Sequence, residues 1–482
     1  MASLSSLGVG SGLDAESIVT KLVALEKQPA DTLTTKNTKL QTQVSTWGKI
    51  QSNFSALQDA ASKLMDSSFW SATTAKSSDD TAVSVTTSSG AAAGNYAVSV
   101  TQLAAAQSVA SSAFTASSTP VGEGTLRIEL GRYTTNNSTT PPAVTFAAKA
   151  AATAVDISIG PGDNTLEKIR DRINTANAGV SASIVTDASG ARLVMRGQNG
   201  EENAFRVSVT ESGTAPGLSA LAYSAATGDT SAMSRTQTAQ NAQATINGLN
   251  VSSASNTMSN VLEGVTLKLN KTTTTPATVN VDLDTASISK GVNEFVTAYN
   301  SVVSTIRVQT LYDETSKTGG PLQGNATARG LLSQMRGLIS SNTSASSTFG
   351  RLSDIGIDIN KDGTLSTKSS KFNDAMGKLG ELQKFFAGSS ETDSSLNGIG
   401  TRVKNLTKQI LDTTSGAIAN STSGLNSTIK RNKDKIDDIN DRAGLIETRL
   451  RKQYSALDTS MAKLTGLSTY VTAQLAALNK SA

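Results

Sequence analysis

The chain contains neither cysteine nor histidine, and these two absences exclude most familiar catalytic and metal sites. Without cysteine, its 482 residues offer no disulfide framework, no thiolate ligand and no thiol nucleophile. Without histidine, serine and cysteine triads and nearly all zinc sites are excluded as well. An enzyme would depend on carboxylates, lysine or tyrosine, and no pair among the 39 acidic residues stands out by its spacing. We therefore predict no catalytic, cofactor-binding or metal-binding residue.

Aromatic residues and long apolar runs are also scarce. Only 4% of residues are aromatic and 37% are apolar, which predicts small or elongated packed units instead of one thick core. The apolar runs are too short for a membrane span, and the first basic residue, Lys21, comes too late for a cleavable signal peptide. The 43 basic residues nearly balance the acidic ones, and basic stretches lack interleaved aromatics, so nucleic-acid binding is not expected.

Proline is rare, and its distribution outlines the organisation of the chain. No proline occurs in residues 30–119 or after residue 321, so long helices are permitted at both ends. Between them, residues 77–285 alternate apolar and polar side chains with turn residues in between, which indicates strands. The sequence thus predicts an α+β multidomain protein in which helical ends enclose a β-rich middle.

Two local patterns specify parts of that middle. The dipeptide Asn247-Gly248 stands between alternating residues and predicts a hairpin with a type I′ turn. A short helix starting near Asn164, with an apolar face of Leu166, Ile169 and Ile173, leads into a hairpin turning at Ser189-Gly190. Together, helix and hairpin form a small α+β module.

Two motifs resemble ligand sites but are better explained as local structure. The stretch "GVGSG" at residues 8–12 follows no strand and lacks the third glycine of a dinucleotide fingerprint, so it is interpreted as a flexible lead. "DINKDGTLSTKS" has the early ligands of a calcium loop, but Ser369 stands where a bidentate glutamate is needed. Its alternating flanks favour a β-hairpin turning at Asp362-Gly363.

Narrow apolar stripes run along both terminal segments. From Ile436 onward, one heptad position is apolar in seven successive repeats, ending at Leu478, but the accompanying position becomes polar at Gln453, Ser460 and Gln474. Near the start, apolar residues recur every seven positions from Leu33 to Ala61, and Ile18, Leu22 and Leu25 form a separate stripe before Pro29. Both ends therefore need a packing partner. Two alternatives remain open: the ends pair with each other within one chain, or they form a seam with other chains.

Five stretches, taken in order, resemble one known family. They are "GVGSGLDAESIVTKLVALEKQP", "FVTAYNSVVSTI", "GPLQGNATARGLLSQMR", "LSDIGIDINKDGTLS" and "YSALDTSMAKLTGLSTYVTAQLAALNK". Through these stretches the chain resembles the bacterial flagellar filament-capping proteins, also called flagellar hook-associated protein 2. "EKIRDRINTANAGVSASIVTDASGARLVM" also resembles the "IN" motif of flagellins and hook-associated proteins.

The resemblance implies a division into four domains. Residues 1–42 with 436–482 would form a terminal coiled-coil leg, and residues 43–76 with 286–435 a mainly helical leg domain with a β-hairpin. Residues 77–110 with 241–285 would form a β-rich head domain, into which residues 111–240 insert an outer head domain with the IN-like module.

The resemblance also implies a function without catalysis. Such a protein caps the distal tip of the flagellar filament, outside the cell, after export by the flagellar type III route without a cleaved signal peptide. Its implied partners are copies of itself in a ring, usually a pentamer, together with flagellin, hook-filament junction proteins and an export chaperone. Alternatives are another axial flagellar protein, such as flagellin or a junction protein, and an added role of the head in adhesion to mucin or host surfaces. For the contacts with these partners the sequence predicts eight apolar residues: Ile18, Leu22, Leu25, Leu457, Met461, Leu464, Leu475 and Leu478.

Overall fold

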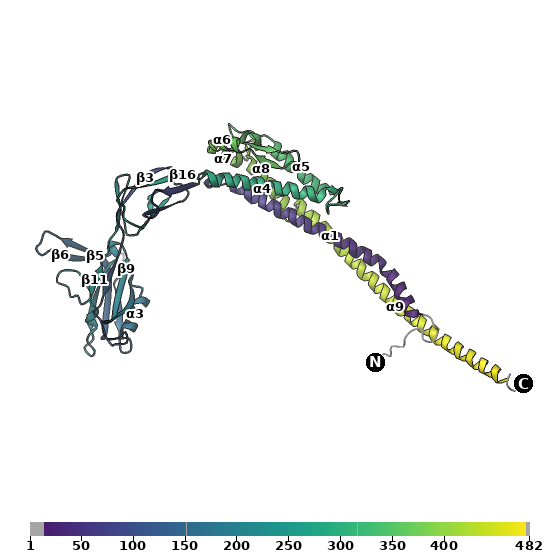
Figure 1. Ribbon diagram of the computed structural model, residues 1–482, viewed down its shortest axis with the longest axis horizontal. Helices are drawn as coiled ribbons and strands as arrows, with labels where there is room; N and C mark the ends of the chain where they lie inside the picture. The colour runs from purple at the N-terminus through teal and green to yellow at the C-terminus, as the bar shows by residue number, and fades with distance from the viewer. Residues whose placement is uncertain (1–13, 151, 316, 479–482) are drawn as a thin grey trace. The chain divides into compact units, whose positions relative to one another are not determined.

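The computed structural model describes residues 14–150, 152–315 and 317–478, which divide into two compact units (Figure 1). The helical unit comprises the chain up to Trp70 and from Thr285 onward. The β-rich unit comprises Ser71–Asp284. The expected α+β multidomain class, with terminal helices that pack against each other, is confirmed.

The helical unit is built on three long helices, supplemented by shorter ones. Helix α1 packs along α9, and α1 also packs against α4 and α8. The helices are α1 (Ala15–Met65), α2 (Ser67–Trp70), α4 (Thr285–Thr310), α5 (Ala326–Ser340), α6 (Ser369–Met376), α7 (Leu379–Ala387), α8 (Ile399–Leu411) and α9 (Ala417–Leu478). A two-stranded ribbon, β17 (Tyr312–Asp313) with β18 (Thr318–Gly319), follows α4.

Helix α1 continues without a break through Pro29. Proline removes one backbone donor and crowds the preceding turn, so Ile18, Leu22 and Leu25 appeared in the sequence as a stripe separate from the rest. In the structure the next residue, Ala30, is buried, and the helix extends on to Met65. Tertiary packing of one helix face outweighs the local cost of the proline.

The core of the helical unit is aromatic at its centre. The ring of Phe386 lies 5.7 Å from Trp70 in a stacked arrangement and meets Phe295 and Phe385 edge-on. Trp47, Phe54 and Ala61, the later members of the predicted seven-residue repeat, are fully buried in the same core. The repeat in α1 therefore forms the face on which the other helices of this unit assemble.

The predicted hairpin after Asp358 is present, but its turn lies at Lys361-Asp362, one residue before the predicted Asp362-Gly363, because the Gly363 N–H donates to the Asn360 carbonyl at 2.8 Å. Strand β19 (Ile357–Ile359) pairs antiparallel with β20 (Leu365–Thr367). The carboxylate of Asp362 accepts hydrogen bonds from the backbone N–H and hydroxyl of Thr364 and lies 3.1 Å from a guanidinium nitrogen of Arg307. These partners lower the pKa of Asp362, the Thr364 hydroxyl being the strongest of them. The acidic motif thus stabilises a turn.

The carboxylate of Glu381, at the start of α7, holds the middle of the loop that follows α5. It accepts hydrogen bonds from the Ser346 hydroxyl at 2.7 Å and from the Ser347 N–H at 2.9 Å. These donors, together with Lys384 at 2.9 Å, lower the pKa of Glu381 to about 2. Because a carboxyl in an unfolded chain titrates at about 4.3, the ionised form stabilises the folded loop.

We expect this loop to loosen in acid. The stabilisation by Glu381 is complete above about pH 4.3 and is lost as the pH falls from there toward 2. Hydrogen-exchange protection factors of residues 343–350 should fall over that range. In Glu381→Gln they should already be low at pH 7 and should change little with acid. Equal protection in the two proteins at pH 7 would contradict this role of Glu381.

The inner part of the β-rich unit consists of two sheets around one core. One sheet has the strand order β1-β16-β3-β12-β13 and the other has the order β14-β15-β2. These strands are β1 (Thr73–Ser77), β2 (Val83–Thr87), β3 (Gly94–Gln102), β12 (Ala242–Ile246), β13 (Leu249–Ser253), β14 (Thr257–Leu262), β15 (Val265–Leu269) and β16 (Ala277–Leu283). All neighbouring strands pair antiparallel. Strand β1 starts at Thr73, ahead of the expected boundary after residue 76.

The predicted type I′ hairpin joins β12 to β13. Asn247 and Gly248 both have positive φ angles, 49° and 81°, as this turn requires. The prediction is confirmed, since Ile246 and Leu249 flank the two-residue turn directly.

The outer part of the β-rich unit has two sheets and helix α3 (Leu166–Thr175) around a second core. One sheet has the order β10-β5-β6, with β7 also paired to β5, and the other has the order β11-β4-β9-β8. The strands are β4 (Ala106–Ala110), β5 (Gly124–Asn136), β6 (Ala143–Ala148), β7 (Val155–Ile159), β8 (Ser181–Asp187), β9 (Gly190–Asn199), β10 (Ala204–Glu211) and β11 (Ser234–Gln237). Strand β4 belongs to this outer part, although residues up to 110 were expected in the inner head domain.

The predicted module of helix and hairpin is confirmed, with one correction. Leu166, Ile169 and Ile173 are fully buried on one face of α3. The turn lies at Ala188-Ser189, one residue earlier than predicted, because Asp187 pairs with Gly190. Gly190 serves instead for close approach: its φ is 127°, and a Cβ there would lie 2.2 Å from the carbonyl oxygen of Phe114.

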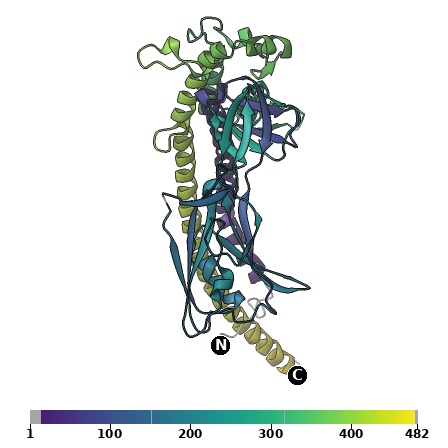
Figure 2. The same cartoon turned by 90° about the vertical axis from the view of Figure 1, so that its left-hand side faces the viewer.

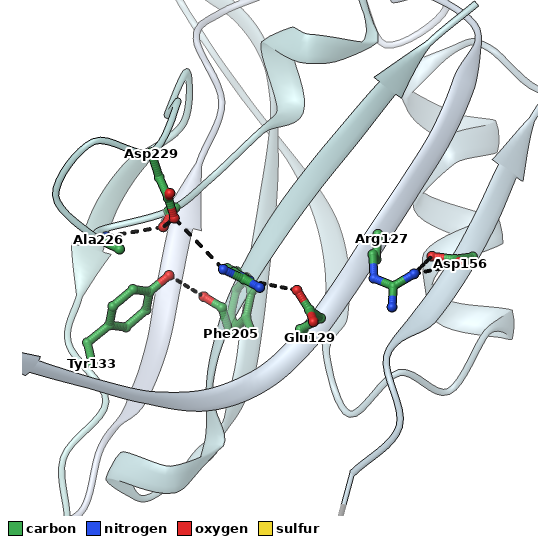
Figure 3. A network of polar contacts seen from close by, with 9 residues as sticks. Arg127, Glu129, Tyr133, Asp156, Phe205, Ala226 and Asp229 are labelled. Carbon is green, nitrogen blue, oxygen red and sulfur yellow. Dashed lines mark hydrogen bonds and ion pairs between the residues drawn. The ribbon is translucent and has the colours of Figure 1, made fainter. Parts of the chain in front are cut away.

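A polar network ties a loop of the outer part to its sheet (Figure 3). The guanidinium of Arg206 on β10 lies 2.6 Å from Glu129 on β5 and 3.9 Å from Asp229 in the loop before β11. It also lies over the ring of Phe146, 4.9 Å from the centroid. Asp229 in turn accepts a hydrogen bond from the Ser224 hydroxyl at 2.7 Å. The loop is therefore fixed to the sheet by charge as well as by burial.

Candidate functional site: the terminal helices

Three polar links set one register between α1 and α9. The Glu16 carboxylate meets the Arg451 guanidinium through two hydrogen bonds of 2.6 Å each, and Glu26 lies 3.3 Å from Arg442. Farther along, the Asn432 amide donates to the Asn37 side-chain oxygen at 2.8 Å, and both residues are buried. Because the residue number rises along α1 as it falls along α9, the two helices are antiparallel.

Near the start of α1, the apolar cluster that it shares with α9 is small. Val19 and Val23 pack with Ala443, while Leu450 and Tyr454 lie partly buried against them. Ala443 and Leu450 belong to the predicted heptad stripe of the last helix, so this stripe does face α1. A small apolar contact with polar links fixes the alignment of α1 against α9 more than it stabilises their pairing.

The ion pair at the start of α1 shifts the pKa values of both its partners. The hydrogen bonds from Arg451 lower the pKa of Glu16, and they raise the pKa of the guanidinium. Arg451 also donates to Glu447, one turn earlier on α9, at 2.9 Å. Since all three side chains are solvent-accessible, water and salt screen them, and the pairs act mainly on alignment.

The structure brings the predicted residues of α1 together on one face, beside the residues that contact α9 and more exposed than they are. Ile18 is half-buried, and Leu22 and Leu25 are 40% and 65% exposed. Val19 and Val23, one residue farther along, were not predicted, yet they make the contact with α9. Their spacing of four residues is the same signal, so periodicity alone could not decide which face turns inward.

Beyond Tyr454, α9 extends past the start of α1 at Ala15, as both views show (Figures 1 and 2). The predicted residues Leu457, Met461, Leu464 and Leu475 lie on this extension and are 36–60% exposed. Three further apolar residues, which were not predicted as contact residues, are also exposed there: Leu467, Tyr470 and Val471. The Leu478 side chain lies outside the described part of the structure.

These exposed residues form one stripe. At 100° per residue, Leu457, Met461, Leu464, Val471 and Leu475 fall within about 80° of the helix circumference. An apolar stripe of this length on a surface helix is typical of an interaction site. We call Leu457, Met461, Leu464, Val471 and Leu475 the α9 stripe.

The whole chain is similar to flagellar hook-associated protein 2 of Escherichia coli strain K12, with 33% identity over 486 residues that cover 98% of each chain. The chain belongs to the flagellar hook-associated protein 2 family. Models of this family match residues 11–107, described as its N-terminus, and residues 239–466, described as its C-terminus. A further model, the flagellin hook IN motif, matches residues 135–199.

Other members of the hook-associated protein 2 family are similar over comparable lengths. The B-type protein of Pseudomonas aeruginosa is 31% identical over 492 residues, covering 98% of each chain. The Salmonella typhimurium protein is 31% identical over 491 residues, covering all of both chains. Among solved structures, the D1-D2-D3 domains of the Escherichia coli flagellar cap protein FliD superimpose with a TM-score of 0.64 and 31% identity, covering 79% of this chain and 99% of that one.

None of the described helices is both long and apolar enough to cross a lipid bilayer. In the same part of the chain, no three histidine, cysteine, aspartate or glutamate residues are grouped as metal ligands.

Proposed function

We propose that this member of the hook-associated protein 2 family caps the distal tip of the flagellar filament. There it holds newly exported flagellin while the subunit folds and inserts, and it prevents the loss of unfolded subunits. The observation that supports this most directly is the α9 stripe, an apolar surface on the only part of α9 that extends beyond its partner helix among the described residues.

The proposed mechanism requires leg contacts that form and break repeatedly. The terminal helices, residues 1–42 with 436–482, would insert between flagellin subunits, with Ile18, Leu22, Leu25 and the α9 residues Leu457, Met461, Leu464, Leu475 and Leu478 in the contacts. Residues 43–76 with 286–435 would form the domain above the leg. The two parts of residues 77–285 would form the plate over the filament end.

The proposed assembly is a ring of identical chains, most simply a pentamer. Each chain would leave the cell through the flagellar export route, with the help of a chaperone. Hook-filament junction proteins would precede the ring at the same growing end. Gold-labelled antibody against the chain should mark only the distal ends of filaments in electron micrographs. Label along the filament would indicate a flagellin instead, and label at the hook boundary would indicate a junction protein.

Polar residues within the leg stripe should keep docking reversible. Gln453 and Ser460 are exposed, and Gln474 donates weakly to the Tyr470 hydroxyl at 3.3 Å. Replacing all three by leucine would complete a continuous apolar seam and strengthen docking. We expect filaments grown for a fixed time to be clearly shorter in this triple variant. Filaments of unaltered length would contradict reversible docking through this face.

A further inference from the structure

One sheet of the β-rich unit ends in an open edge strand. Strand β13 is the last strand of its five-stranded sheet and pairs only with β12. Ile246 and Leu249 close the two-residue turn, so Leu249, Val251 and Ser253 direct their backbone groups toward β12. The N–H and C=O groups of Asn250 and Ser252 therefore point away from the sheet.

The other sheet edges of the β-rich unit are blocked in one way or another. The outer side of β1 is covered by β2, whose Thr87 hydroxyl donates to the Thr73 carbonyl at 2.6 Å. Strand β14 has an irregular register between Met258 and Leu262. In the outer part, β6 is hydrogen-bonded to the loop at Thr227. Each remaining edge strand contains a charged residue: Asp156 on β7, Asp187 on β8, Arg206 on β10 and Arg235 on β11. Charges, bulges and covering segments are the usual protections against edge pairing.

Strand β13 has none of these protections. Its chain segment contains no charged residue from Thr236 to Leu262, a stretch that includes the whole hairpin. Leu249 lies on the core face of the sheet, opposite the buried Ile246, yet it is 73% exposed. At this edge of the sheet, the apolar core face therefore ends at the exposed Leu249 side chain, which a further strand would cover.

Two asparagines hold this edge rigidly in place. At one end, the Asn247 side chain accepts from the Ala97 N–H at 2.8 Å. At the other end, the Asn256 side chain bonds both backbone groups of Ala104, at 2.7 and 2.9 Å. A strand fixed at both ends loses little conformational entropy when it pairs.

We propose that β13 is a self-association surface, through which two copies of this chain join their sheets edge to edge. A second copy fits because the segment is uncharged: antiparallel pairing with itself brings no like charges together. The contact is two-fold symmetric and closes at two copies, so it differs from a ring contact and does not depend on the capping role.

The pairing has a defined register. With Val251 opposite the partner's Val251, Asn250 lies opposite the partner's Ser252, and these two outward-pointing pairs exchange four backbone hydrogen bonds. Leu249 then lies diagonal to the partner's Val251 on the core face, where the two side chains cover each other.

A single cysteine tests this register, because the chain has no cysteine of its own. Directly opposed residues of a pair without mutual hydrogen bonds have Cα atoms about 4.5 Å apart, within the range of a disulfide. Full-length Val251→Cys should therefore form a covalent dimer under mild oxidation. Thr278→Cys, exposed on the central strand β16, should remain monomeric under the same conditions. Equal crosslinking of the two variants, or none in Val251→Cys, would overturn the proposal.

Charge at the edge provides a test that needs no oxidation. Asn250→Lys with Ser252→Lys would oppose two lysines at each pair and should raise the dimer dissociation constant, measured by sedimentation velocity, about tenfold or more. Thr278→Lys adds charge to the same sheet face, away from the edge, and should associate as the wild type does. In the wild type, the Asn250 and Ser252 amides should exchange more slowly as protein concentration rises. Association unchanged by the edge lysines, or amide exchange independent of concentration, would refute the pairing.

Discussion

Filament growth should fail when Leu464 and Leu475 are both replaced by aspartate. These leucines are 60% and 58% exposed on the α9 stripe, so the variant should fold with a free energy of unfolding within about 0.5 kcal/mol of the wild type. If the stripe is buried against flagellin, two unpaired carboxylates in that contact cost more than about 3 kcal/mol. Tip occupancy should then fall by about 100-fold or more. Immunogold counting of labelled tips and flagellin released into the medium measure the effect.

The matched control places the same charges on the opposite side of the same helix. Thr459 and Ala473 are exposed and lie about 160–200° around the helix from Leu457. Thr459→Asp with Ala473→Asp should leave filament length and motility unchanged. If Leu464→Asp with Leu475→Asp supports normal filaments, the α9 stripe is not the docking surface. If the control fails equally, any added charge on this helix is disruptive and the face has no special role.

The second large effect is expected at the buried amide pair between α1 and α9. Asn37→Ala would leave the Asn432 amide buried without its partner, which costs about 1–3 kcal/mol. Because the apolar cluster that the two helices share near the start of α1 is small, local opening of the two-helix segment should become about tenfold or more frequent. Hydrogen exchange in residues 15–37 and 432–454 measures this opening.

A double substitution separates alignment from stability. Asn37→Leu with Asn432→Leu replaces both amides by apolar groups of similar branching, so exchange should be no faster than in the wild type. The pairing should, however, lose its preference for one register. A disulfide between Glu26→Cys and Arg442→Cys, residues that face each other in the native register, should form in lower yield when added to this double variant. Unchanged yield would show that the amide pair does not set the register.

Local elements were predictable because their signals are local. The burial of Leu166, Ile169 and Ile173 follows from helical periodicity, and the turn at Asn247-Gly248 follows from the backbone angles that these two residues tolerate. The turn near Gly190 lies one residue earlier than predicted, and Gly190 instead meets a distant carbonyl, that of Phe114, where a Cβ would not fit. No pattern within the hairpin itself contains that information.

The terminal helices divide in the same way. Periodicity predicted apolar stripes on both, and the family resemblance pointed to their use in assembly. Which face turns inward depends on the partner helix: Val19 and Val23 meet Ala443, while Leu22 and Leu25, equally apolar, remain exposed. The polar links from Glu16 to Arg451 and from Asn37 to Asn432 join residues about 400 positions apart, beyond the reach of any local pattern.

By itself the sequence determined the absence of thiol and imidazole chemistry, the long helices at both ends, the β-rich middle and the family. These depend on composition and on the order of neighbouring residues. Only the tertiary structure decided the register of α1 against α9, the continuation of α1 through Pro29, the placement of β4 in the outer sheets and the open edge at β13. Each of these depends on which distant surfaces become buried together, and burial is a property of the folded chain, not of any one segment.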